Sequence, residues 1–185
     1  MDYAKAAGTA ASTGRKPYLE PGIEADLIIS TAKLIEGGHK GNNYVFEFRV
    51  LTAKAIAEGV TPPPTGAERA YVVDLDNAQY GFGNLMALAE GLEGGKMPGL
   101  SEEQKKAMLA EGKSTDAVGE ADRGAKGNAL KALLGEAVGM KIRVTTSGVV
   151  TREKKPFTAL TWHHIAGQTI DQVRELRSKL QNGTF

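Results

Sequence analysis

The chain has 185 residues, of which 41% are hydrophobic and 24% charged, which is typical of one soluble globular domain. Its 23 basic and 22 acidic side chains leave a net charge of +1, so any electrostatic site must be local rather than a property of the whole molecule. The absence of cysteine excludes disulfides, thiolate catalysis and cysteine-ligated zinc.

The sequence contains no phosphate loop and no nucleophile elbow, and its three histidines have no acid or nucleophile partner at a catalytic spacing. We therefore expect no enzyme activity and no metal or cofactor. The first residues do not form a basic region followed by an apolar one, and no segment approaches the roughly 20 apolar residues of a membrane span. We expect a cytoplasmic protein without membrane contact.

Residues 1–17 contain little that a core could bury, which predicts a flexible N-terminal arm ending at Pro17. Beyond it the pattern predicts a mainly β fold with α insertions. The segments with strand-like sequence are 18–35, 44–54, 70–75, 141–146 and 157–165. Three glycines between residues 36 and 42 predict a hairpin that joins the first two strands.

The strand at 44–54 places Tyr44, Phe46 and Phe48 on one face, because alternate residues of a strand point the same way. Such a stripe can stack on unpaired bases, at about 1–3 kcal/mol per base. A buried core is the commoner outcome and the one we favour here. In that case Arg49 points outward and becomes the better candidate for a ligand contact.

The middle of the chain, residues 82–138, predicts a helical insertion. Three consecutive prolines before it, at 62–64, predict an exposed and stiff loop. Leucine spacing predicts a helix at 82–92, and the capping-box pattern Ser101 to Gln104 predicts a second one. Residues 113–128 are small and polar, which predicts a flexible loop before a short helix at 128–138.

Positive charge concentrates in residues 141–165, where five basic residues and one acidic residue, Glu153, leave a local charge of +4. Lys141 and Arg143 share one face of a strand, and the adjoining hairpin carries the other three: Arg152, Lys154 and Lys155. A cationic strand and hairpin can follow a phosphate backbone, although a solvated surface has the same sequence pattern.

The strand at 157–165 carries Trp162, which shares a face with Leu160 and is expected in the core unless its indole is exposed to stack on a base. His163 and His164 point to opposite faces and do not suit a shared metal. Residues 168–185 form a C-terminal helix and tail. The apolar stripe of that helix either packs on the rest of the chain or forms a seam between two copies in a homo-oligomer.

Three sequence segments carry a family resemblance: YLEPGI at 18–23, YVFEFRVL at 44–51 and LGEAVGMKIRV at 134–144. Their order resembles that of small bacteriophage single-stranded-DNA-binding proteins of the OB-like type. The resemblance implies an OB-like five-stranded barrel at 18–167, interrupted by the insertion at 82–138. It also implies a role in phage DNA replication or recombination in the host cytoplasm. Several members of that family have an acidic C-terminal tail, which this chain lacks.

Two hypotheses follow. The first is sequence-independent binding of single-stranded DNA, and the second is a phage structural or assembly protein that acts through protein–protein contacts. The local charge and the resemblance favour the first, and the near-neutral net charge favours the second. For the first hypothesis the expected phosphate contacts are Arg49, Lys141, Arg143, Arg152, Lys154 and Lys155, and the expected stacking residues are Tyr44, Phe46, Tyr71 and Trp162.

Overall fold

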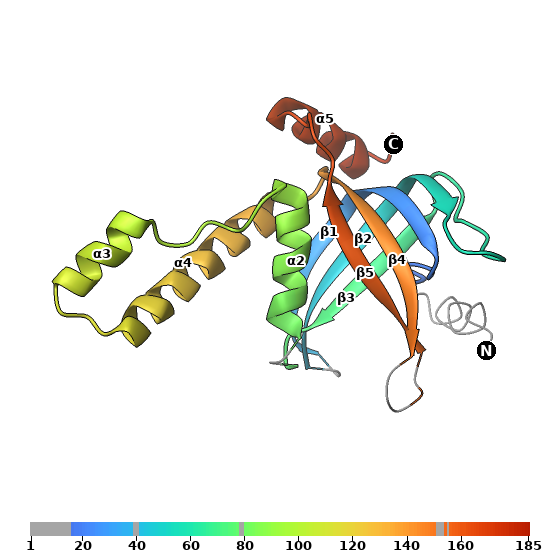
Figure 1. The fold of residues 1–185 in the computed structure, drawn as a ribbon. Helices are drawn as coiled ribbons and strands as arrows, with labels where there is room; N and C mark the ends of the chain where they lie inside the picture. Colours follow the sequence, from blue (N-terminus) through green and yellow to red (C-terminus); the bar gives the residue numbers. More distant parts are fainter. Residues whose placement is uncertain (1–15, 39–40, 78–79, 151–153, 155) are drawn as a thin grey trace.

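The computed structural model describes residues 16–38, 41–77, 80–150, 154 and 156–185. In these residues it forms one five-stranded antiparallel sheet and four helices, a mixed α/β arrangement (Figure 1). The strands are β1 (Ile23–Gly38), β2 (Gly41–Ala55), β3 (Glu68–Asp74), β4 (Lys141–Val150) and β5 (Pro156–His164). The helices are α2 (Gly81–Glu93), α3 (Glu102–Ala110), α4 (Thr115–Glu136) and α5 (Ile170–Gln181).

The sheet has the strand order β3-β2-β1-β4-β5, and each neighbouring pair is antiparallel. Strand β1 lies at its centre and pairs with β2 on one side and with β4 on the other. Register shifts in β1, at Asp26/Leu27 and Ile29/Thr31, bend the strand as β-bulges do. The sheet curls as a result (Figure 1), but its edge strands β3 and β5 are not paired with each other within the described residues, so it is open.

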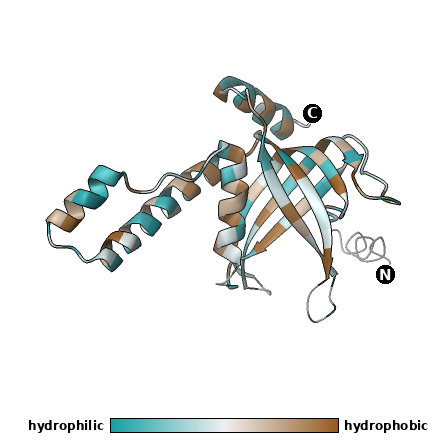
Figure 2. Ribbon diagram, in the orientation of Figure 1, coloured by the Kyte–Doolittle hydropathy of each residue, from teal (hydrophilic) through white to brown (hydrophobic). Residues whose placement is uncertain are grey.

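The concave face of the sheet holds the hydrophobic core. Phe46, Phe48 and Val50 of β2 are fully buried there, so the aromatic stripe predicted for this strand belongs to the core. Helix α2 covers this face with Leu85, Leu88 and Leu92. Figure 2 shows the matching alternation of apolar and polar residues along the strands.

The segment at 113–128 is not the loop that the sequence predicted, because it forms most of helix α4. Ser114 caps this helix by accepting a hydrogen bond from the amide of Ala117, and Val118 is buried. Asp122 accepts a hydrogen bond from the amide of Leu100 (2.9 Å) and pairs with Lys126 (2.8 Å). Glycines suggested a loop since each costs about 1 kcal/mol in a helix. The Ser114 cap, the tertiary hydrogen bond from Leu100 and the i,i+4 pair with Lys126 nevertheless stabilise the helix.

Helices α3 and α4 pack against each other and project away from the sheet (Figure 1). The predicted capping box of α3 is confirmed, with Ser101 and Gln104 each bonding the other's backbone amide. No residue of α3 is buried, and the helix is largely polar (Figure 2).

Helix α5 begins with a second capping box, formed by Thr169 and Gln172. It packs on the connection between α4 and β4, where Arg177 donates through Nε to the carbonyl of Val138 (3.0 Å) and through Nη2 to that of Glu136 (2.6 Å). A β-carbon at Gly139 would lie 2.5 Å from the carbonyl oxygen of Val173, so the two segments approach closely. None of the helices in the described part of the chain combines the length and apolar character that a membrane span requires.

Candidate nucleic-acid interface

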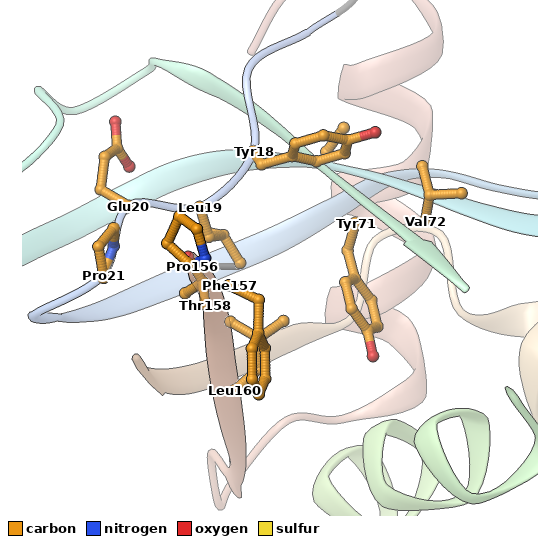
Figure 3. Close-up of a pocket in the computed structure, with 11 residues that line it drawn as sticks. Tyr18, Leu19, Glu20, Pro21, Tyr71, Val72, Pro156, Phe157, Thr158 and Leu160 are labelled. Carbon is orange, nitrogen blue, oxygen red and sulfur yellow. The ribbon is translucent and has the colours of Figure 1, made fainter. Parts of the chain in front are cut away.

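A cleft of about 360 Å³ lies where the two edges of the sheet face each other (Figure 3). Its volume is at the lower end of the range for small-molecule sites, about 300–1,000 Å³. Three segments far apart in the sequence form its walls. The lining residues are Tyr18, Leu19, Glu20 and Pro21 before β1, Ala70, Tyr71 and Val72 of β3, and Pro156, Phe157, Thr158 and Leu160 of β5.

The segment before β1 forms one wall because it is held along the free edge of β3. The amide of Ala70 donates to the carbonyl of Pro17 (2.8 Å), and Tyr18 pairs with Ala70 as a parallel bridge. Lys16 is paired with Glu47 at 3.0 Å and with Glu68 at 3.2 Å. Most of the predicted N-terminal arm at 1–17 lies outside the described residues, but its last two residues are therefore anchored to the sheet.

Glu20, the carboxylate among the lining residues, is held by an arginine. Arg69 donates to both carboxylate oxygens, with its Nε 2.9 Å from Oε2 and its Nη2 bonded to Oε1. The backbone carbonyl of Glu20 also accepts a hydrogen bond from the Thr146 hydroxyl at 2.6 Å. The bidentate pair neutralises and fixes this wall, because a planar guanidinium matches a carboxylate in both geometry and charge.

Tyr71 connects the cleft to a cluster of aromatic rings in the core. The ring of Tyr71 lies 5.4 Å from that of Trp162 and 6.4 Å from that of Phe46, and Trp162 lies 5.8 Å from Phe48. These distances are typical of interacting aromatic pairs. Burial raises the pKa of Tyr71 to about 12, so its hydroxyl keeps its proton at neutral pH.

The β4–β5 hairpin places positive charge beside the cleft. Pro156 lines the cleft and pairs with Val150 at the last position of the β4–β5 ladder. Lys154 lies in the connection two residues before Pro156, is exposed, and adopts a φ of 60°. The other two cations predicted for this hairpin, Arg152 and Lys155, lie outside the described residues.

The remaining predicted cations do not line the cleft, and two of them are already paired. Arg143 points outward from β4 and forms a bidentate pair with Asp26, at 2.6 and 3.0 Å. Arg49 points outward from β2, donates to the carbonyl of Phe185 (2.5 Å), and lies 3.9 Å from Glu68. Lys141 is on the same face of β4 as Arg143, and its backbone amide donates to the side chain of Gln168.

The predicted stacking residues gather on the inner face of the sheet, but they differ in access. Phe46 is 0% exposed, so the hypothesis that it stacks on a base is wrong for this structure. Tyr44 and Trp162 are partly buried against the core and do not line the cleft. Tyr71 is the predicted residue that lines it.

Sequence reasoning missed two aromatic residues of the cleft, Tyr18 and Phe157, which are 49% and 48% exposed. Each follows a proline, Pro17 or Pro156, at the start of a strand or edge segment. A proline next to an exposed aromatic residue was the available signal, because proline favours sheet edges, where a backbone donor is not required.

Comparison of the chain with protein-family models, curated proteins and solved structures finds no match.

Proposed function

We propose that this chain binds single-stranded DNA without regard to sequence, using the cleft between β3 and β5 and the neighbouring β4–β5 hairpin. One observation carries the proposal: the cleft has aromatic residues in its lining, and the exposed Lys154 lies two residues before Pro156, which also lines it. Proteins that bind single strands combine stacking surfaces for bases with cations that follow the phosphates. Tyr18 and Phe157 would stack on bases, and the hairpin would contact the backbone.

The topology supports an OB-like barrel that is partly open. OB folds are five-stranded Greek-key barrels, often incompletely closed, that bind oligonucleotides. Here β1 pairs with both β2 and β4, and the edge strands β3 and β5, which are not paired with each other in the described residues, both line the cleft. Helix α2 follows β3 and contributes to the core, which supports the proposed insertion of helices between β3 and β4.

The proposed interface is smaller than the sequence suggested. Arg143 and Arg49 would have to exchange a carboxylate or the Phe185 carbonyl for a phosphate, which lowers the gain from either contact. Among the described residues of the β4–β5 connection, the exposed Lys154 would supply the phosphate contact. The resemblance to bacteriophage single-strand-binding proteins supports a role in phage DNA replication or recombination.

The test compares two charge reversals by fluorescence anisotropy of a labelled oligo-dT. Lys154→Glu is expected to weaken binding and to reduce the slope of log K against log salt by about 0.7 for each phosphate that the variant no longer neutralises. Lys106→Glu, on the exposed surface of α3, makes the same change in net charge and is expected to leave binding near the wild-type value. Equal effects from both reversals would contradict a local interface at the hairpin.

A second candidate function is assembly with another protein. The observation that favours it is the projecting α3–α4 pair, in which α3 has no buried residue and Leu109 is 46% exposed. A wild-type protein that fails to bind oligo-dT even at low salt would favour this assembly role over strand binding.

A further inference from the structure

Ile28 of β1 is buried on the convex face of the sheet, away from the core. It is 0% exposed, but it is not among the residues that form the core cluster on the concave face. It pairs with Arg49 of β2 on one side and with Lys141 of β4 on the other. Directly paired residues of an antiparallel sheet point to the same face, so the three side chains form a row with Ile28 at its centre. An apolar side chain on this face needs a cover to be fully buried.

The C-terminal segment, residues 168–185, is attached to both ends of this row. At one end the side chain of Gln168 accepts a hydrogen bond from the amide of Lys141 (2.7 Å) and donates one to its carbonyl (2.8 Å). At the other end the guanidinium of Arg49 donates to the carbonyl of Phe185 (2.5 Å) and lies 5.5 Å from the centre of its ring. The segment therefore spans the row and is placed to cover the isoleucine at its centre. Figure 1 shows α5, which belongs to this segment, lying across one end of the sheet.

The attachment between these two ends is mainly polar. No residue of α5 is buried, and Ile170 at its start is 71% exposed. Arg177 holds the middle of the helix through hydrogen bonds to the carbonyls of Glu136 and Val138. A segment with few buried apolar groups opens locally at a lower free energy than the whole fold. Gly167, with a φ of 83°, directly precedes the segment and provides a hinge.

We propose that residues 168–185 form a strap that opens while the sheet stays folded, and that the contact of Phe185 with Arg49 is the clasp that holds the strap closed. Opening uncovers Ile28, so the strap controls access to this row on the convex face. The inference concerns the protein alone and does not depend on the proposed binding of DNA.

The clasp has the chemistry of a contact that both holds and releases. It combines a charge-assisted hydrogen bond with a cation–π contact, and it joins residues that are 136 positions apart. It does not use every donor of the arginine, because Nε of Arg49 is buried and has no hydrogen-bond partner within the described part of the chain. That unmade hydrogen bond costs free energy in the closed state and weakens the clasp.

The test uses the absence of cysteine from the chain, because a single introduced thiol then reports access to a single position. Ile28→Cys places the thiol under the strap. Leu27→Cys places it at the neighbouring position, which is equally buried but belongs to the core on the concave face. A thiol-reactive reagent is expected to label Ile28→Cys faster, since opening of the strap is enough to expose it, whereas Leu27→Cys requires unfolding of the sheet.

Two variants weaken the clasp. Phe185→Ala removes the ring but keeps the arginine and its charge near the thiol, and it is expected to speed labelling of Ile28→Cys about 2- to 5-fold, the effect of one exposed cation–π contact. Arg49→Met also removes the hydrogen bond and is expected to speed labelling about 10-fold. Arg123→Met, on the exposed surface of α4, is the matched control for the loss of a charge and is expected to leave the rate unchanged.

Gly91→Ala separates opening of the strap from unfolding of the sheet. A β-carbon at Gly91 would lie 2.6 Å from Cβ of Trp162, so this change disturbs packing that is present whether the strap is open or closed. It is expected to speed labelling of Leu27→Cys and to leave Ile28→Cys unchanged.

Each outcome decides part of the proposal. Equal labelling rates at positions 27 and 28, both raised by Gly91→Ala, would show that Ile28 is reached only by unfolding and would overturn the strap. Faster labelling at position 28 that neither clasp variant changes would overturn the clasp. Faster labelling at position 28 that both clasp variants increase and Gly91→Ala does not would support the strap and its clasp.

Discussion

Replacing Gly91 with alanine tests how α2 is held against β5. Gly91 is buried in α2, and a β-carbon there would lie 2.6 Å from Cβ of Trp162 and 3.1 Å from Cδ1 of Ile142. The nearer atom is next to the backbone of β5, so the helix or the strand has to move. Overpacking of this kind costs about 1–3 kcal/mol, and the helix preference of alanine returns up to about 1 kcal/mol.

We therefore expect Gly91→Ala to lower the free energy of unfolding by about 1–2 kcal/mol. Urea unfolding measures it, with the fluorescence of Trp162, the single tryptophan of the chain, as the probe. Gly124→Ala is the control, because Gly124 is exposed in α4 and a β-carbon there would meet nothing within 4 Å. This control is expected to gain about 0.5–1 kcal/mol. A Gly91→Ala protein at least as stable as the wild type would refute the close packing of α2 on β5.

Three further predictions concern titrating groups. Burial raises the pKa of Tyr71 from 10.0 to about 12, so stability should fall as the pH rises from 10 to 12, and Tyr71→Phe should reduce that fall in urea unfolding measured across this range. Burial alone would raise the pKa of Glu47, but hydrogen bonds from Lys16 and Thr31 outweigh burial and leave the pKa below 4.5. The free energy of unfolding should therefore fall as the pH drops below 4.5. It should fall less steeply in Lys16→Met, which lacks one of these hydrogen bonds. Asp122 accepts hydrogen bonds from Lys126 and from the Leu100 amide, and these lower its pKa. Asp122→Asn removes the charge that strengthens the bond from the Leu100 amide, so hydrogen exchange at that amide should become faster. An unchanged exchange rate would contradict the role of Asp122 in fixing the α3–α4 pair.

Local signals in the sequence predicted much of the fold. Alternation predicted the strands, the glycines at 36–42 predicted the β1–β2 connection, and Ser101 with Gln104 predicted the start of α3. These features are set by neighbouring residues, so a single sequence is enough to find them. The burial of Phe46 and Phe48 followed from the same alternation.

Other features depend on contacts between distant residues and could not be read locally. Helix α4 looked like a loop because its glycines disfavour a helix, while the contact of Asp122 with Leu100 is tertiary. The pairing of Arg143 with Asp26 joins residues 117 positions apart and removes a cation that looked free.

The cleft itself was not predictable for the same reason. Tyr18 and Phe157 approach it from opposite ends of the chain, and their meeting depends on how far the sheet curls. Curl is set by the bulges of β1 and by the packing of α2, and neither has a reliable signal in one sequence. Sequence reasoning therefore found the aromatic residues of the inner face but missed the pair at the opening.

The central claim is that a single strand lies in the cleft between β3 and β5. Photochemical cross-linking of an oligonucleotide containing 5-iodouracil, followed by mass spectrometry of the labelled peptides, tests both the binding and its place. The account predicts cross-links at Tyr18, Tyr71 or Phe157 that unlabelled oligo-dT suppresses and duplex DNA does not. Cross-links confined to α3 and α4, or none at low salt, would contradict it.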